Sequence, residues 1–126
     1  MPLPAESQPS GSFPRTSRLL KHSDFQAVYK QGRKTFSGNM TAFYRERNDG
    51  ASARVGLAVG RVLGGAVQRN RIKRRLRAAV QPNLAELTRP LDVVLHPRKA
   101  VLTMVFAELK AEVGKLFAVV EKGRGR

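Results

Sequence analysis

The sequence of 126 residues contains no cysteine and no long run of apolar residues. Without cysteine the chain can form neither a disulfide nor a thiolate metal site, which favours an intracellular protein. No apolar segment approaches the roughly 20 residues that a membrane-spanning helix requires. Four prolines interrupt the first 18 residues, which therefore lack the apolar centre of a signal peptide. We expect a cytoplasmic protein with no membrane partner.

Acidic residues are also scarce in this chain. It has 24 Lys+Arg against 9 Asp+Glu, which gives a formal net charge of +15 at pH 7. Such an excess of one sign repels itself in a compact fold and usually indicates a polyanionic partner. Nucleic acid is the favoured partner, while an anionic membrane surface or an acidic protein would satisfy the charge less often.

The length and the apolar content of 41% are those of one compact domain with its own core. Residues 1–17 are rich in proline, serine and glycine, so we predict a disordered N-terminal extension there. Residues 18–122 form the predicted folded domain, and residues 123–126 form a basic C-terminal tail.

The pattern of apolar residues predicts the order helix, three strands, helix, strand, helix. Such a chain folds as an α+β sandwich, a single αβββαβα domain in which helices cover a four-stranded sheet. Small residues occupy one face of the third strand, which would let another backbone approach closely. The predicted helices span 23–31, 65–82 and 101–121, and the predicted strands span 35–37, 40–47, 54–60 and 91–95.

Local signals define the ends of the first helix and the buried side of the last one. Ser23 and Gln26 fit a capping box, and Gly32 is expected to end the first helix in a left-handed conformation. The apolar stripe of the last helix repeats at spacings of three and four residues and predicts its core contacts. Its members are Leu102, Val105, Leu109, Val113, Leu116 and Val120.

The central helix is strongly basic. No acidic residue occurs between positions 50 and 85, and the i,i+4 pairs of the helix all repel, namely Arg69–Lys73, Arg71–Arg75 and Lys73–Arg77. Each repulsion costs about 0.2–0.5 kcal/mol, and cations near a helix start also oppose the macrodipole. Because nothing in the sequence balances this charge, we interpret the helix as a surface for a polyanion.

A helical projection divides this helix into two sides. An apolar stripe faces the core, formed by Ile72, Leu76, Ala79 and Val80. Several polar residues lie opposite or beside that stripe, with Asn70, Arg74 and Arg77 opposite it, Arg71 and Arg75 on one flank, Lys73 on the other, and Arg69 close to its edge. The helix can therefore bury one side and still present forked donors to phosphates.

Residues 64–77 read Gly-Gly-Ala-Val-Gln-Arg-Asn-Arg-Ile-Lys-Arg-Arg-Leu-Arg, and they closely resemble the signature of the bacterial ribonuclease P protein subunit. Segment 54–59 resembles the third strand of that family, and 23–32 resembles its first helix. The resemblance extends over residues 18–122. The sequence departs from the family pattern at Gly65, where Asn is frequent, and at His96-Pro97, where small or apolar residues are usual.

The resemblance implies an accessory role in an endoribonuclease. In this family a large RNA is the catalyst, and it uses bound magnesium ions to remove the 5′ leader of precursor tRNA. The expected partners are therefore the catalytic RNA and precursor tRNA, with no small-molecule substrate and no metal held by the protein alone. The family fold also implies a left-handed βαβ crossover, although general rules favour the right-handed form.

The resemblance also assigns site residues by position. The residues expected to contact RNA are Arg61, Arg69, Asn70, Arg71, Lys73, Arg74, Arg77 and Arg98. The residues expected to line a cleft for the leader are Phe25, Tyr29 and Phe43. Phe43 shares its strand face with Thr41 and Arg45, a setting that suits sequence-tolerant stacking on a single strand. For Phe25 and Tyr29, a role in the core remains the alternative.

A nuclease with its own active site is the enzymatic alternative. It would need clustered carboxylates for a metal or paired histidines for acid–base chemistry. Asp24, Asp49 and Asp92 lie on three separate predicted elements. His22 and His96 are the only histidines, and both are expected to be loop or cap residues. The sequence therefore predicts no catalytic residue on this chain.

Two binding proteins remain as alternatives. A ribosomal or other structural RNA-binding protein would have the same composition and fold, but it would have no reason to prefer precursor over mature tRNA. A helix-turn-helix DNA-binding protein fits less well, because the basic helix follows a glycine-rich turn after a strand.

Overall fold

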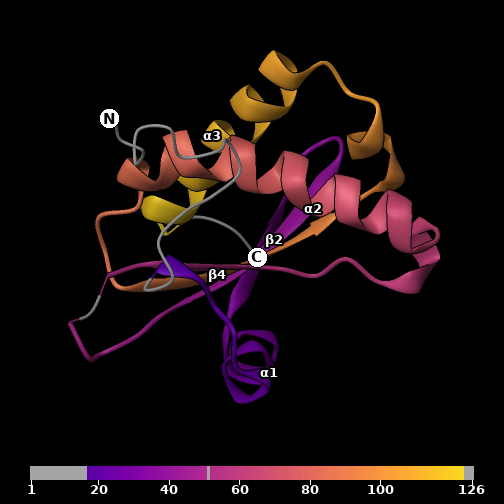
Figure 1. The fold of residues 1–126 in the computed structure, drawn as a ribbon. Coiled ribbons are helices and arrows are strands. Elements are labelled where there is room, and N and C mark those ends of the chain that lie inside the picture. Colours follow the sequence, from indigo (N-terminus) through magenta and orange to yellow (C-terminus); the bar gives the residue numbers. More distant parts are fainter. Residues whose placement is uncertain (1–16, 51, 124–126) are drawn as a thin grey trace, which may run out of the picture.

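The computed structural model describes residues 17–50 and 52–123, which form an α+β fold (Figure 1). The predicted order of elements is confirmed. Most of the predicted N-terminal extension and of the basic tail lies outside the described residues. The elements are α1 (His22–Gln31), β1 (Arg33–Phe36), β2 (Met40–Glu46), β3 (Arg54–Leu57), η2 (Arg61–Leu63), α2 (Ala66–Val80), η3 (Gln81–Glu86), β4 (Leu91–Pro97), η4 (Lys99–Leu102) and α3 (Phe106–Glu121).

The four strands form one mixed sheet in the order β1-β2-β4-β3. β2 pairs antiparallel with both β1 and β4, whereas β3 pairs parallel with β4. The register places Phe43 of β2 opposite Val94 of β4 and Thr41 opposite His96. Because side chains alternate along a strand, these residues project from one face of the sheet and their neighbours from the other.

The first face of the sheet carries the main core. α2 and α3 lie on this side of the sheet, and α1 lies on the other (Figure 1). The predicted stripe of α2 is buried against the sheet and α3, so the helical projection is confirmed for its apolar side. The principal members from the strands are Met40, Ala42, Tyr44, Val55, Val93 and Leu95.

The second face is covered by α1 alone. Leu19, Val28 and Val94 form a small buried cluster there, with Phe25 and Phe43 packed against it. The predicted close approach to this face occurs at Gly56, where a Cβ atom would lie 2.6 Å from Cζ of Phe25. The sequence predicted that another backbone would approach here, but the approaching group is the aromatic ring of Phe25.

The predicted end signals of α1 are wrong in detail. Lys21 is the N-cap and makes no side-chain capping bond, so no capping box forms. Gly32 follows the helix in an extended conformation, with φ −94° and ψ −177°, and not in a left-handed one. Glycine is nevertheless required, because a Cβ atom there would collide with the carbonyl oxygens of Val28 and Tyr44.

The predicted single helix over 101–121 is also wrong. The chain forms η4, breaks, and begins α3 at Phe106, so that Val105 is 62% exposed and not part of the core. Arg75 of α2 explains the break, because its guanidinium donates to the carbonyl oxygens of Val101, at 3.0 Å, and Met104. These bonds satisfy backbone acceptors that a continuous helix would have used.

All four strands differ from prediction at their ends: β1 spans Arg33–Phe36, and β2 ends at Glu46, one residue earlier than predicted. β3 stops at Leu57, and β4 continues two residues beyond Leu95 to Pro97. The extension of β4 follows from its pairing with β2, since the N–H of Arg98 still donates to the carbonyl oxygen of Asn39 at 2.8 Å. Among the helices of the described residues, none combines the length and apolar character needed to cross a bilayer.

Candidate nucleic-acid interface

The basic face of α2 consists of Arg69, Asn70, Arg71, Lys73, Arg74 and Arg77. Asn70, Arg71 and Arg74 are exposed, whereas Arg69, Lys73 and Arg77 are half-buried. Arg69 packs as the projection predicts, with its Nε donating to the carbonyl oxygen of Gly64 at 3.2 Å. A shallow hollow of about 550 Å³ runs along this face beside Asn70 and Arg74.

The cations of the basic face are not neutralised within the fold. Across residues 17–50 and 52–123, the ion pairs join acidic side chains to Arg45, Arg47, Arg54 and Arg89, and none involves α2. The N-terminus of α2 has Gly65 as its N-cap, without a side-chain capping bond and without an acidic residue in the first turn. Both features leave positive potential for an external anion.

Three aromatic side chains meet on the α1 side of the sheet. This ring cluster consists of Tyr29 of α1, Phe43 of β2 and His96 of β4. Ring centroids lie 5.3 Å apart for Tyr29 and Phe43, 4.9 Å for Phe43 and His96, and 5.5 Å for Tyr29 and His96, all in edge-to-face contact. The Nζ atom of Lys34 lies 5.9 Å from the Phe43 ring, which adds a cation to the same surface.

His96 is the functional candidate that the sequence interpretation missed. The sequence led us to expect a loop or cap residue, but His96 lies in β4 opposite Thr41. Its Nε2 is hydrogen-bonded to the hydroxyl group of Tyr29 at 2.8 Å. Burial lowers the pKa of His96, which favours the neutral imidazole, and burial also raises the pKa of Tyr29. The alternation of Leu91, Val93 and Leu95 is the sequence signal that could have placed His96. A strand extended past Leu95 would put His96 on the sheet face opposite to these three residues.

The structure separates Phe25 from the ring cluster. Its ring packs over Gly56 and Leu19 in the small core beneath α1, so the alternative of a core role fits Phe25. Tyr29, by contrast, is 37% exposed. Phe25 also borders a small hollow of about 130 Å³ whose opposite wall includes Lys73 and Arg77 of α2. The two predicted sets of residues therefore approach one another at the edge of the sheet along β3.

Asp92 is the centre of a network of ion pairs that also includes Asp24 and Asp49. Its buried carboxylate accepts hydrogen bonds from Arg47 and, at 2.9 Å from both Nε and Nη2, from Arg54. Arg54 also lies 3.4 Å from Asp24, and Arg47 lies 3.2 Å from Asp49. The hydrogen bond to Asp92 raises the pKa of Arg54. The three aspartates, predicted to lie on separate elements, are thus bridged by arginines.

This arrangement has a consequence for metal binding. Within the part of the chain that the structure describes, no three acidic or histidine side chains gather where they could hold a metal ion. The carboxylate of Asp92, which is the most buried acid, is already shared between guanidinium groups. These residues do not fit a magnesium site.

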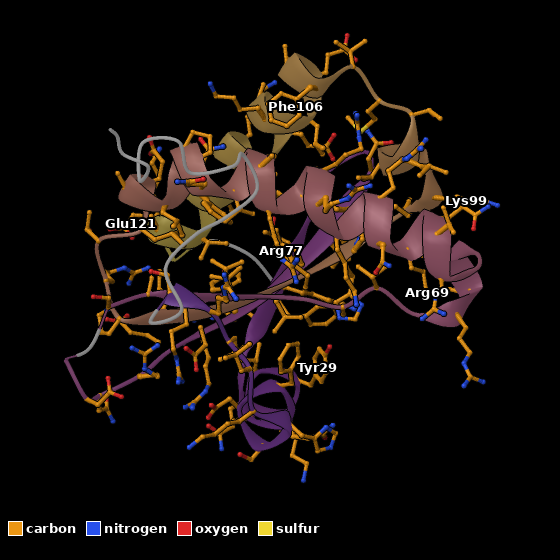
Figure 2. The ribbon with its side chains drawn as sticks, viewed as in Figure 1. Tyr29, Arg69, Arg77, Lys99, Phe106 and Glu121 are labelled. Carbon is orange, nitrogen blue, oxygen red and sulfur yellow. The ribbon has the colours of Figure 1, made fainter. Side chains whose placement is uncertain are left out.

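The remaining predicted contacts lie beyond the ends of β3 and β4. Arg61 is exposed in η2, and Arg98 is exposed immediately after β4. Figure 2 shows Arg69 and Arg77 along α2 and Tyr29 on α1, on the other side of the sheet. The candidate interface therefore has two parts, the basic face of α2 and the ring cluster.

Comparison with known proteins identifies the family. The family model described as ribonuclease P matches residues 13–121. The ribonuclease P protein component of Streptococcus pneumoniae (strain Hungary19A-6) is 36% identical over 111 residues, covering 86% of this chain and 89% of that protein. The RNase P protein of Staphylococcus aureus has a TM-score of 0.73 at 22% identity, covering 85% of this chain and 97% of that chain. The RNase P protein from Thermotoga maritima has a TM-score of 0.71 at 25% identity, covering 80% and 94%. This chain therefore belongs to the family of bacterial ribonuclease P protein components.

Proposed function

We propose that this subunit binds the catalytic RNA of ribonuclease P through the basic face of α2 and binds the 5′ leader of precursor tRNA beside the ring cluster. By holding both RNAs it promotes endonucleolytic 5′ maturation of tRNA. The observation that carries the proposal is the set of α2 cations without a carboxylate partner among the described residues.

Charge and geometry support the assignment of α2 to the catalytic RNA. Its arginines repel one another along the helix, and that repulsion is relieved only when an external anion binds. Guanidinium groups also match the oxygen atoms of phosphate with paired donors. Arg61 and Arg98, which are exposed beyond the ends of β3 and β4, add two further cations that an RNA can contact.

The ring cluster supports the assignment of the leader. A leader of variable sequence requires contacts that any nucleotide can make, and stacking on an aromatic ring is such a contact. Phe43 and Tyr29 present ring surface next to the ammonium group of Lys34, which can hold a phosphate. We assign Phe25 a supporting role, because its ring fixes α1 on the sheet.

The chemistry is assigned to the RNA subunit. Asp92 is held by arginines, and among the described residues no group of three acidic or histidine side chains forms around His96, so neither belongs to a clustered site for a metal ion. The magnesium ions that activate the attacking water are therefore expected on the catalytic RNA.

Cleavage at low magnesium concentration tests the proposal. A precursor tRNA is incubated with a bacterial ribonuclease P RNA, with and without this protein, and the release of the 5′ leader is followed. We expect the protein to stimulate cleavage and to raise the affinity for precursor over mature tRNA. Absence of stimulation, at a salt concentration where the protein demonstrably binds the RNA, would contradict it. Equal affinity for both tRNAs would instead favour a structural RNA-binding protein.

A further inference from the structure

A second hollow lies on the other flank of the basic face of α2. It has a volume of about 440 Å³, and we call it the α2–α3 hollow because its lining residues are Arg71, Arg74, Arg75 and Ala78 of α2 and Phe106 of α3. This volume falls within the range of about 300–1,000 Å³ that is typical of ligand sites. The hollow is separate from the ring cluster, since Phe106 lies on the opposite side of the fold from Tyr29 (Figure 2).

Phe106 is the aromatic side chain of this hollow. It is the first residue of α3 and is 39% exposed, whereas Phe117 of the same helix is fully buried. The buried residues of α3 begin at Leu109, three positions later. The core therefore uses Phe117 and leaves part of the Phe106 ring open to a ligand.

Arg75 holds the segment that carries this ring. Its guanidinium donates to the carbonyl oxygens of Val101, in η4, and Met104, between η4 and α3. Because these bonds fix the break before α3, they also fix where the Phe106 ring lies. Arg75 is thus engaged within the fold, and it acts as a positioning residue for the hollow.

The other two arginines supply the positive charge of the hollow. Arg71 and Arg74 are exposed, and neither forms an ion pair across residues 17–50 and 52–123. Arg74 also borders the hollow of about 550 Å³ along the basic face, so the two hollows adjoin at this side chain. An RNA backbone that follows the basic face therefore reaches the α2–α3 hollow without leaving the positive surface.

An aromatic ring beside unpaired guanidinium groups fits a nucleotide. The ring can stack on any base, and arginines bind the phosphates on either side. In a regular double helix each base is covered above and below by its neighbours, so it offers no face to Phe106. Unpaired bases of RNA loops and bulges, by contrast, can turn out of the stack and lie against an aromatic side chain. The chemistry of the hollow therefore favours an unpaired nucleotide.

We propose that the α2–α3 hollow binds one unpaired base of the catalytic RNA, which stacks on Phe106 while Arg71 and Arg74 hold the adjoining phosphates. The proposal rests on the proposed function and extends the interface with the catalytic RNA from α2 to the start of α3. It also adds selectivity. A basic helix alone binds any phosphate backbone, whereas the hollow selects an RNA that offers an unpaired nucleotide at this place.

Substitution of Phe106 tests the hollow. The dissociation constant for a bacterial ribonuclease P RNA is measured by filter binding, at a temperature at which melting curves show each variant to be folded. We expect about tenfold weaker binding by Phe106→Leu, which keeps an apolar side chain without the ring, and near wild-type binding by Phe106→Tyr. Val105→Ala is the matched control, because Val105 is 62% exposed and precedes Phe106 but does not line the hollow, so the constant should not change.

The salt dependence of binding separates stacking from charge. Phe106→Leu should leave the slope of log affinity against log salt unchanged, because no phosphate contact is lost. Arg74→Ala should lower that slope by about 1. An equally lowered slope for Phe106→Leu would mean that the ring acts only by placing the arginines, and the proposal would be overturned.

Abasic substitution in the catalytic RNA identifies the nucleotide. RNAs that each lack one unpaired base are bound to the wild-type subunit and to Phe106→Leu. At one position, loss of the base should weaken binding to wild type about tenfold and should have no further effect with Phe106→Leu, since the two changes remove the same contact. If every position has equal effects on both subunits, no base stacks on Phe106.

The possible results separate this proposal from the proposed function. If Phe106→Leu binds the catalytic RNA like wild type while Arg71→Ala binds it more weakly, the hollow is not a base site and the proposed function stands. If Phe106→Leu weakens only the binding of precursor tRNA to the holoenzyme, the hollow belongs to the leader and the proposal is overturned. If neither variant weakens binding of the catalytic RNA, both are wrong.

Discussion

The two faces of the sheet are covered to different extents. On one face, α2 and α3 together bury a continuous core that includes Ile72, Leu76 and Phe117. On the other, the single helix α1 covers a cluster with three buried members, Leu19, Val28 and Val94. The remainder of that second face carries the ring cluster, in which Tyr29 is exposed, and ion pairs centred on the buried carboxylate of Asp92.

This difference shows how one sheet can separate stability from binding. Alternation along β2 and β4 sends apolar side chains to the α2–α3 face and Phe43, Asp92 and His96 to the α1 face. Substitutions on the α1 face should therefore affect binding at a small cost in stability. The exception should be the end of that face at Asp92, where a buried network of ion pairs takes the place of apolar packing.

Asp92→Asn is expected to have the largest effect, because it should lower the free energy of unfolding although Asp92 lies on the α1 face. The substitution removes the buried carboxylate that pairs with Arg47 and leaves Arg47, which is itself buried, only the exposed carboxylate of Asp49; breaking a buried ion pair typically costs about 3–5 kcal/mol. The free energy of unfolding is measured by urea denaturation. Asp49→Asn is the control, since its side chain is 59% exposed and its loss should be about 0–1 kcal/mol. Equal losses would show that the network does not stabilise the α1 face.

Phe43→Ala tests the binding role of the same face. Loss of a stacking ring should weaken the binding of precursor tRNA by about 1–3 kcal/mol and leave mature tRNA unaffected. Affinities are measured for the reconstituted holoenzyme by filter binding. Val105→Ala provides a control for the loss of an exposed apolar side chain, because Val105 is 62% exposed but directly precedes α3. An equal loss for both tRNAs would mean that Phe43 acts through folding.

Arg71→Ala tests whether the basic face of α2 contacts the phosphates of the catalytic RNA. Removal of one phosphate contact should lower the slope of log affinity for the catalytic RNA against log salt by about 1. Thermal stability should stay the same or rise slightly, because the repulsion between Arg71 and Arg75 is removed. Lys110→Ala, which removes an exposed cation from α3, should leave the slope unchanged. A similar change for both variants would indicate a general effect of net charge.

The smallest effect is expected from the protonation of His96. Burial holds its pKa below the ordinary value of 6.5, so the unfolded chain takes up a proton first as the pH falls. The contribution of neutral His96 to stability is thus fully present above about pH 6.5 and is lost as the pH falls toward the folded pKa. Urea denaturation between pH 7 and pH 5 should show a shallower decline for His96→Gln than for wild type. Identical declines would contradict the assignment.

Much of the fold follows from local sequence patterns. The stripe of Ile72, Leu76, Ala79 and Val80 predicts the buried side of α2 because a helix repeats every 3.6 residues whatever it packs against. Alternation in β2 likewise predicts that Met40, Ala42 and Tyr44 face the core and that Phe43 faces the other way. The boundaries were less predictable, since Arg75 ends the η4 segment through contacts with residues 26 and 29 positions away.

The sequence by itself determined the family signature, the excess of positive charge and the two-sided character of α2, because all three depend on residues close together in the chain. Only the tertiary structure decided that His96 joins Tyr29 and Phe43 and that arginines bridge three aspartates. Those contacts join elements distant in the sequence, and the register of β2 against β4 sets them. A one-residue shift of that register would turn His96 to the other face of the sheet.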